Sequence, residues 1–308
     1  MLFIVNPTAA RGRGRRVWEA ARRQLEARGV AFVARLTAQP GDATRLTGEA
    51  LRAGERVIVA LGGDGTLSEV VNGWFDEAGR AIRPEAALGL VPCGTGSDFR
   101  RTLGIADPRA ALDAICAGKT APLDVVRVAL RDPAGRPVSR YAINLVSFGL
   151  GGDSVALVNA WRETWPRWIG GHARFVLAAL QGLRNYRNRP VEVRLDDGPP
   201  FTIQSNFLVA ANGCYAGGGM LFAPHARPDD GRLDVVLTDG AGRWEIVREL
   251  PGLRSGAYLA NPRVSEHRAA SLDIRGDDPL AIDIDGEAAG RTPARLTVLP
   301  AALRFLVP

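Results

Sequence analysis

The sequence predicts two domains: an α/β N-terminal domain with a mostly parallel sheet, and a C-terminal antiparallel β-sandwich. Over residues 1–128, short apolar segments alternate with longer amphipathic ones, the pattern of strands joined by helices. After residue 128, short apolar segments follow one another directly, separated by glycine, proline and aspartate, which indicates antiparallel strands joined by turns. A chain of 308 residues is long enough for two such domains.

In the N-terminal domain, predicted as residues 1–128, strands and helices are expected to alternate. The expected strands are Leu2–Asn6, Ala31–Leu36, Val57–Leu61, Leu88–Val91 and Pro122–Val128. The expected helices are Arg15–Ala27, Asp42–Ala53, Leu67–Glu77 and Arg109–Ala117. Because ligands of parallel sheets bind beyond the carboxyl ends of the strands, the loops that follow these strands are the candidate site.

In the C-terminal domain, predicted as residues 129–292, period-two patterns and turn residues mark the strands. They are Val125–Leu130, Tyr141–Phe148, Val191–Leu195, Phe201–Ala211, Leu233–Thr238, Ala270–Arg275, Leu280–Ile284 and Arg295–Leu299. A helical insert at about residues 155–186 interrupts them, with tryptophans alternating with arginines. Such a segment suits an anionic membrane interface, although a helix that packs over the sandwich explains the pattern as well.

A glycine-rich loop follows the expected strand Val57–Leu61. It reads Gly62-Gly63-Asp64-Gly65-Thr66 and leads into a helical pattern that begins with Leu67, Ser68 and Glu69. Glycines let the backbone approach a ligand closely, and the N–H groups of the loop and of the following helix suit phosphate oxygens. Asp64 offers a hard oxygen for Mg²⁺ or for a water bound to it. An ordinary strand-to-helix turn is the alternative, and the sequence favours a nucleotide site.

A second loop repeats this arrangement after Leu88–Val91. It reads Pro92-Cys93-Gly94-Thr95-Gly96-Ser97-Asp98. Ser97 or Asp98 could also cap a helix there, and a capped helix N-terminus can still face a phosphate group. Together with Asn6-Pro7 after the first strand, these loops are expected to converge at one edge of the sheet.

The segment Asp283-Ile284-Asp285-Gly286-Glu287 is the second chemical feature. If it is one strand, its period of two places Asp283, Asp285 and Glu287 on one face. Three aligned carboxylates repel one another, which raises the pKa of at least one and favours proton abstraction or contact with a metal. A solvated strand face that ends in an Asp-Gly turn is the alternative.

Composition limits the remaining possibilities. The formal net charge is +6, and residues 1–40 hold eight arginines but only two acidic residues. Basic patches serve phosphates, anionic membranes or nucleic acid, and nucleic-acid binding is not expected because the sequence offers no stacking platform or known module. No apolar run is long enough for a spanning helix and the first residues resemble a strand, so a cytoplasmic protein is expected. The sequence leaves the oligomeric state open.

These segments, in this order, resemble the diacylglycerol kinase catalytic-domain family, which includes sphingosine and ceramide kinases and soluble bacterial lipid kinases. The resemblance runs from residue 6 to residue 287 and rests on Asn6-Pro7, Thr37 before Gly41-Asp42-Ala43, Gly62–Thr66 with Glu69, Gly94-Thr95 with Asp98, Asp230-Gly231 and Asp285-Gly286-Glu287. It implies an NAD kinase/diacylglycerol kinase-like α/β domain, a β-sandwich and an active site in the cleft between them. It also implies that residues 293–308 return to the first domain.

The resemblance further implies ATP and Mg²⁺ as cofactors and a lipid alcohol as the acceptor, with contact at the inner membrane surface. The implied ATP-binding residues are Asn6, Thr37, Gly62, Gly63, Asp64, Gly65, Thr66, Leu67, Ser68, Glu69, Gly94 and Thr95. Glu287 is the implied general base with Asp285 as its rival, and Asp64 and Asp98 are implied to organise catalytic magnesium and water. Asp230, with the carbonyls of Arg227 and Arg232, is implied to hold a structural magnesium.

Two positions depart from the family pattern, since Ser68 and Ser97 stand where the family commonly has asparagine. Serine keeps a hydroxyl oxygen but loses the amide donor. The leading hypothesis is an ATP-dependent lipid kinase that phosphorylates a diacylglycerol-like or sphingoid-like hydroxyl. The alternatives are an NAD kinase-like phosphotransferase, which shares the Gly-Gly-Asp-Gly-Thr loop, and a catalytically silent regulator that binds nucleotide or lipid.

Overall fold

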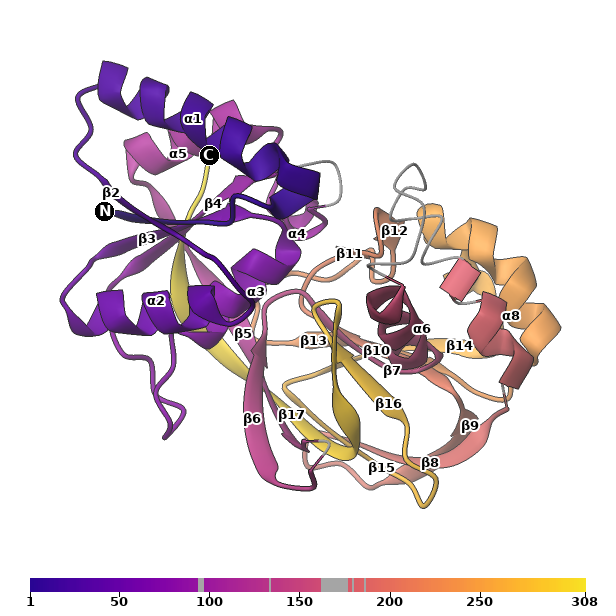
Figure 1. Cartoon of the computed structure of the whole chain (residues 1–308). Coiled ribbons are helices and arrows are strands. Elements are labelled where there is room, and N and C mark those ends of the chain that lie inside the picture. The colour runs from indigo at the N-terminus through magenta and orange to yellow at the C-terminus, as the bar shows by residue number, and fades with distance from the viewer. Residues whose placement is uncertain (94–96, 133, 162–176, 179, 186) are drawn as a thin grey trace. The chain divides into compact units, whose positions relative to one another are not determined.

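The computed structural model describes residues 1–93, 97–132, 134–161, 177–178, 180–185 and 187–308. They form two compact units, one of Met1–Val125 with Pro300–Pro308 and the other of Val126–Leu299 (Figure 1). The first unit is α/β and the second is an antiparallel β-sandwich, so the predicted fold class is confirmed. Two long strands, β5 (Thr120–Arg131) and β17 (Glu287–Leu306), carry the chain from one unit into the other.

The first unit is built on parallel strands. They are β1 (Leu2–Val5), β2 (Val33–Leu36), β3 (Val57–Gly62) and β4 (Ala87–Pro92), in the order β2-β1-β3-β4. The end of β17 joins this sheet, where Arg304 and Phe305 pair in parallel with β4. The strand order reverses between β1 and β3, and ligands of open parallel sheets bind beyond the carboxyl ends of strands at such a switch point.

Helices cover both faces of this sheet. They are α1 (Ala9–Ala27), α2 (Asp42–Arg52), α3 (Asp64–Asn72), α4 (Phe99–Thr102) and α5 (Pro108–Ala117). Helices α1 and α5 pack together on one face, and α2 and α3 pack together on the other (Figure 1). This double cover explains why β1 and β4 are apolar throughout, since every residue of both strands is buried.

The predicted helix at Leu67–Glu77 is wrong at both ends. Helix α3 begins at Asp64 and ends at Asn72, so most of the glycine-rich loop is the first turn of the helix. Helix α1 is assigned from Ala9, but Ala10, Arg11 and Gly12 have positive φ, so its regular part begins after Gly12, close to the predicted Arg15. Periodicity places the regular part of a helix better than its ends, because first-turn residues face solvent or a ligand and not the core.

The sandwich consists of two antiparallel sheets that share β17. One runs β14-β13-β10-β7-β16-β17 and the other contains β9, β8, β15, β5 and β6. The bounds are β6 Pro137–Ala142, β7 Leu145–Gly149, β8 Arg189–Leu195, β9 Phe201–Ser205, β10 Phe207–Ala211, β13 Leu233–Thr238, β14 Val264–Ala269, β15 Ser271–Arg275 and β16 Ala281–Ile284. A separate hairpin pairs β11 (Tyr215–Ala216) with β12 (Met220–Leu221).

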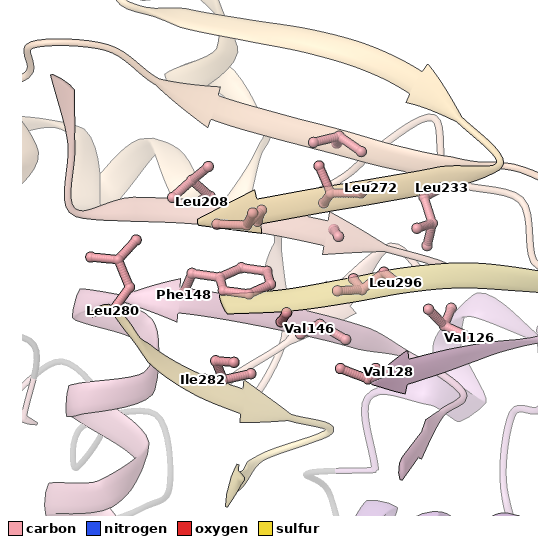
Figure 2. Packing of buried hydrophobic residues seen from close by; sticks show 14 of the residues in the cluster. Val126, Val128, Val146, Phe148, Leu208, Leu233, Leu272, Leu280, Ile282 and Leu296 are labelled. Carbon is pink, nitrogen blue, oxygen red and sulfur yellow. The ribbon is translucent and has the colours of Figure 1, made fainter. Parts of the chain in front are cut away.

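Alternate residues of the strands fill the space between the two sheets. Phe148, Leu208 and Leu233 from one sheet meet Val126 and Leu272 from the other in a single apolar cluster (Figure 2). The sheet that contains β10 and β13 is buried on its outer face as well, where Val209 and Val236 belong to a second cluster. This sheet is therefore buried on both faces at β10 and β13, as the continuous apolar run of β10 indicates.

Short helices η2 (Leu250–Arg254) and η3 (Ala257–Ala260) pack against the second cluster. The other short helices of this unit are α6 (Leu150–Ala160), η1 (Leu183–Asn185) and α8 (Arg243–Glu249). Helix α6 lies against β16 and β7 (Figure 1). Most of the predicted insert at residues 155–186, including Trp165, Trp168 and Phe175, lies outside the described residues. The sequence prediction missed α8 and β14 and merged β6 with β7 and β9 with β10.

Candidate functional site

A hydrogen bond connects the end of β1 to the start of α3, the helix that follows β3, at the switch point of the parallel sheet. Asn6, the residue after β1, donates from Nδ2 to the hydroxyl of Thr66 over 3.0 Å. Its Oδ1 accepts from the backbone and the hydroxyl of Thr8, at 3.1 and 2.9 Å. One asparagine side chain therefore connects the loop after β1 to the first turn of α3, where the sequence predicts phosphate contacts.

The two glycines before α3 have different roles. A Cβ on Gly62 would lie 2.3 Å from Thr66 Oγ1 and 2.5 Å from Thr66 Cβ, so no side chain fits there. A Cβ on Gly63 would meet nothing within 4 Å, and the backbone of Gly63 is extended. Gly62 thus packs the turn against the helix, whereas Gly63 leaves an open approach to the N-terminus of α3. The first-turn N–H groups of a helix lack intrahelical acceptors and attract anions.

Asp64 joins the first loop to the second. Its Oδ2 accepts from the backbone N–H of Asp98 at 2.8 Å, and its Oδ1 accepts from that of Phe99 at 3.3 Å. Both donors stand at the start of α4, so Asp64 holds the second loop beside the first. Asp64 is half-buried, and a carboxylate oxygen is the type of ligand that Mg²⁺ prefers.

The second loop is described only in part, since Gly94, Thr95 and Gly96 lie outside the described residues. Asp98 is buried, and its Oδ1 lies 3.8 Å from Nε of Arg101. Ser97, which replaces the family's usual asparagine, is 1% exposed, and its hydroxyl has no hydrogen-bond partner in the described part of the chain. A buried hydroxyl without a partner is costly, which favours a ligand or water at this position.

Two other predicted ATP-binding residues make structural contacts. Glu69 Oε2 accepts from the backbone N–H of Ala43 at 3.1 Å and so caps the N-terminus of α2. The backbone N–H of Thr37 donates to the carbonyl of Val5 at 2.9 Å, which extends the pairing of β2 with β1. Leu67 and Ser68 are both buried in α3. These residues shape the edge of the sheet, and their predicted contacts with ATP stay predictions.

The predicted alignment of Asp283, Asp285 and Glu287 on one strand face is wrong. Asp285 and Gly286 form a two-residue turn in which both have positive φ, and Ile284 pairs with Glu287 across the hairpin. Such turns favour Asp-Gly because glycine and aspartate tolerate a positive φ. The three carboxylates therefore belong to a strand, a turn and the next strand.

Asp285 is a buried structural anchor. Its Oδ2 accepts from the backbone N–H of Ile143 at 2.9 Å, and its Oδ1 accepts from Asn144 and Leu145 at 2.9 and 3.1 Å. Ile143 and Asn144 lie in the gap between β6 and β7 and Leu145 begins β7, so the bend around Asp285 explains why the predicted strand Tyr141–Phe148 is broken. Burial raises the pKa of Asp285 to about 6, although the three amides act in the opposite direction.

Asp283 is buried behind the turn. Its Oδ2 accepts from the hydroxyl of Ser147 at 2.9 Å. Burial raises the pKa of Asp283 to about 8, the Ser147 hydroxyl lowers it, and the charges of Asp285 and Glu287 raise it further. Glu287 is half-exposed, so of these three carboxylates it alone is accessible to a substrate. The raised pKa that the sequence predicted is present, but its main cause is burial and not alignment.

A polar network that sequence analysis missed supports this turn. Asn144 donates from Nδ2 to the carbonyl of Tyr215 at 2.8 Å, and Asn212 donates from Nδ2 to that of Ile143 at 2.8 Å. Both asparagines are buried. A single asparagine inside an apolar run, as in Ile143-Asn144-Leu145, is the sequence signal that could have found them.

The structure does not favour a magnesium ion at Asp230. Its Oδ1 accepts from the backbone N–H of Arg232 at 3.0 Å, and its Oδ2 forms an ion pair with the guanidinium of Arg268. Arg227 pairs with Asp229 at 3.5 Å. Among the described residues, no group of three or more histidine, cysteine or acidic side chains could hold a metal. A guanidinium already balances the Asp230 carboxylate, so we derive no step through a metal here.

The first unit is an α/β domain with an open glycine before a helix N-terminus at the switch point of its parallel sheet, and the second unit is an antiparallel sandwich with a half-exposed carboxylate at Glu287. Residues 1–128 match the diacylglycerol kinase catalytic domain. Residues 144–307 match the YegS C-terminal NAD kinase beta sandwich-like domain. The chain belongs to the family that these two domains define, and the predicted family is confirmed.

Relatives of known name agree with this assignment. A protein from Xanthomonas axonopodis pv. citri (strain 306), named "Probable lipid kinase YegS-like", is 35% identical over 92% of this chain and 89% of its own length. A "Diacylglycerol kinase" from Mycobacterium tuberculosis (strain ATCC 25618 / H37Rv) is 29% identical over 99% of this chain and 94% of its own length.

Two solved structures share the fold. The crystal structure of a diacylglycerol kinase from Bacillus anthracis str. Sterne has a TM-score of 0.71 at 22% identity and covers 100% of this chain and 96% of its own. Yeast NADH kinase complexed with NADH has a TM-score of 0.52 at 11% identity, with 100% of this chain and 83% of its own covered.

In the described part of the chain, no helix combines the length and apolar character needed to cross a bilayer.

Proposed function

We propose that this protein is a lipid kinase that transfers the γ-phosphate of ATP to a lipid hydroxyl with the help of Mg²⁺. The observation that carries the proposal is the start of α3, where the open Gly63 precedes a helix N-terminus at the switch point of the sheet. The family and the names of the relatives support the same function. Phosphoryl transfer needs mainly positioning and charge neutralisation, and an open helix N-terminus supports the proposal because it suits phosphate oxygens.

For the nucleotide, we propose that the first turn of α3 binds phosphate oxygens through backbone N–H groups. Gly62 and Thr66 keep this turn in place, and Asn6 fixes it to β1. The loop at Gly94 and Thr95 supplies the second set of contacts, and Thr37 lines the same edge. Mg²⁺, when bound near Asp64, neutralises charge on the phosphates.

For proton removal, we propose Glu287 as the general base. Asp285 was its rival in the sequence, but its carboxylate accepts three backbone N–H groups and is 8% exposed. Asp283 is 4% exposed and, with its pKa raised to about 8, holds its proton at neutral pH. Glu287 takes the proton of the lipid hydroxyl as that oxygen attacks the γ-phosphorus.

The lipid acceptor is proposed as diacylglycerol-like or sphingoid-like. The experiment is transfer of labelled γ-phosphate from ATP and Mg²⁺ into a total lipid extract, with NAD as a separate acceptor. We expect labelled lipid with the wild type and a loss of 10²-fold or more in Asp64→Ala, the scale for removing one electrostatic stabiliser. Label in NAD alone would indicate an NAD kinase-like enzyme, and ATP binding without any transfer would indicate a silent binding protein. Either result would overturn the proposal.

A further inference from the structure

The turn that precedes β13 holds a carboxylate that already has two partners. Asp230 Oδ1 accepts from the backbone N–H of Arg232 at 3.0 Å, and its Oδ2 forms an ion pair with the guanidinium of Arg268. The side chain of Asp230 is only 18% exposed, so this carboxylate is largely withdrawn from water. A carboxylate in such a place needs a positive charge beside it.

The sheet brings Arg268 to this position. Arg268 lies on β14 and is paired with Asp234 of β13 in the antiparallel register, so the two side chains project from the same face of the sheet. Asp234 is buried, and this burial raises its pKa, whereas the charge of Arg268 lowers it and that of Asp230 raises it. One guanidinium therefore lies near two carboxylates, those of Asp230 and Asp234.

Other charged side chains of the turn are paired as well. Nε of Arg227 lies 3.5 Å from Oδ1 of Asp229. A guanidinium nitrogen of Arg232 lies 3.2 Å from Oδ2 of Asp196, whose Oδ1 accepts from the backbone N–H of Ser271 at 2.8 Å. Because Ser271 begins β15, these contacts connect the turn to the next strand through protein groups alone.

A metal ion at Asp230 would compete with this guanidinium. Mg²⁺ binds carboxylate oxygens at about 2.0–2.1 Å, so an ion on Asp230 would lie within a few ångströms of Arg268. Two cations so close together repel each other, and the repulsion is strong where water is largely excluded. The Asp230 carboxylate therefore suits either the guanidinium or the ion, and the chain itself supplies the guanidinium.

We infer that Arg268 takes the place of the magnesium ion that the family resemblance implies at Asp230, so that a cation of the chain itself stabilises this turn and the sandwich unit folds without a metal. The inference goes beyond the proposed function and does not rest on it. Magnesium in the proposed phosphoryl transfer then serves the nucleotide alone.

The experiment is thermal unfolding of the nucleotide-free protein in EDTA and in excess Mg²⁺. We expect the wild type to unfold at the same temperature in both. Arg268→Met keeps an unbranched stem but removes the charge, and in EDTA its midpoint should fall by up to about 2–4 °C, the scale for one partly exposed ion pair in a unit of this size. In Mg²⁺ the midpoint should rise again, because an ion that binds only the folded state stabilises it.

Arg263→Met is the matched control. Arg263 pairs with Glu245 at 3.2 Å, and the exposed fractions of these side chains, 51% and 25%, are close to the 54% and 18% of Arg268 and Asp230. This control should lose a similar amount of stability, which Mg²⁺ should not restore. Arg268→Lys keeps a positive charge, so Mg²⁺ should change its unfolding temperature as little as that of the wild type.

The unfolding temperature of the wild type decides the inference without any change at Arg268. A lower temperature in EDTA than in Mg²⁺, found for the wild type and for Asp64→Ala alike, would overturn it, since an ion would then stabilise the fold away from the proposed nucleotide site. An Arg268→Met protein that Mg²⁺ does not stabilise would also overturn it, because Asp230 would not be a cation site. Failure of the labelled-phosphate experiment would leave these results unchanged and would overturn the proposed function alone.

Discussion

The side-chain amide of Asn6 donates a hydrogen bond to the hydroxyl of Thr66 over 3.0 Å, and this contact joins the end of β1 to the first turn of α3. Asn6→Ala removes the donor and leaves the buried Thr66 hydroxyl without it. We expect a loss of about 1–3 kcal/mol in the free energy of unfolding. We also expect weaker ATP binding, because the turn that faces the phosphates loses its fixed position.

Isothermal titration with ATP and thermal unfolding measure the two effects separately. Asn72→Ala is the control, since Asn72 lies in the same helix and donates to the carbonyl of Ser68 at 2.9 Å. The control should lose stability but keep ATP binding. If both variants bind ATP like the wild type, the Asn6–Thr66 contact has no part in the phosphate site.

The two glycines before α3 give a second prediction. Gly62→Ala brings a Cβ within 2.3 Å of Thr66 Oγ1, so the turn must shift, and we expect a large loss of stability and of ATP binding. Gly63→Ala meets no atom within 4 Å, so the protein should unfold at the wild-type temperature. Its ATP binding should fall because the methyl group occupies the phosphate approach. If Gly63→Ala binds ATP with the wild-type affinity, the phosphates do not bind next to Gly63.

Asp285 and Glu287 are expected to fail in different ways. Asp285→Asn sets an amide N–H donor against a backbone N–H that the carboxylate now accepts, and we expect a loss of about 1–3 kcal/mol in the free energy of unfolding. Glu287→Gln should unfold like the wild type but lose about 10²–10⁴-fold in turnover, the usual contribution of a general base. Denaturant unfolding and turnover of each variant test this. A stable, inactive Asp285→Asn beside an active Glu287→Gln would reverse the assignment.

Asp283 gives a prediction about pH. Its pKa is about 8 in the folded protein against 3.8 as the ordinary value, so the folded protein binds its proton more tightly than the unfolded chain. The free energy of unfolding should therefore decrease as the pH rises from about 4 to about 8, by up to about 1.4 kcal/mol per unit. Asp283→Asn keeps an acceptor for Ser147 without a charge, so its stability should decline less over that window. Parallel denaturant curves for both proteins would contradict the prediction.

The sequence was sufficient for the four strands β1 to β4 and for the existence of helices α1, α2, α3 and α5, but it missed the short helix α4 and the ends of α3. Buried strands such as Val57–Gly62 are continuous apolar runs in the sequence, which indicates that both faces of the strand are covered. The same reasoning failed at Asp285-Gly286, where the period of two was continued through a turn. Asp-Gly between apolar segments is itself a hairpin signal and should have taken precedence.

Other parts of the site could not be predicted because they depend on distant contacts. Nothing local to Asp64 indicates that it binds the backbone of Asp98 and Phe99, or that Glu69 caps a helix that begins at Asp42. Arg268 meets Asp230 only because β13 and β14 pair in a fixed register. Helix α8 has only 7 residues, which are too few for a hydrophobic period to be recognised in the sequence.

The last strand has a consequence for the order in which the protein can be made. Pro300–Pro308 belongs to the same unit as Met1–Val125, and the whole sandwich lies between them in the chain. During synthesis, the parallel sheet therefore cannot gain its pairing of β4 with Arg304 and Phe305 until the sandwich has been translated. A chain that ended before residue 300 would lack Arg304 and Phe305 and would leave the edge strand β4 of the parallel sheet without this partner.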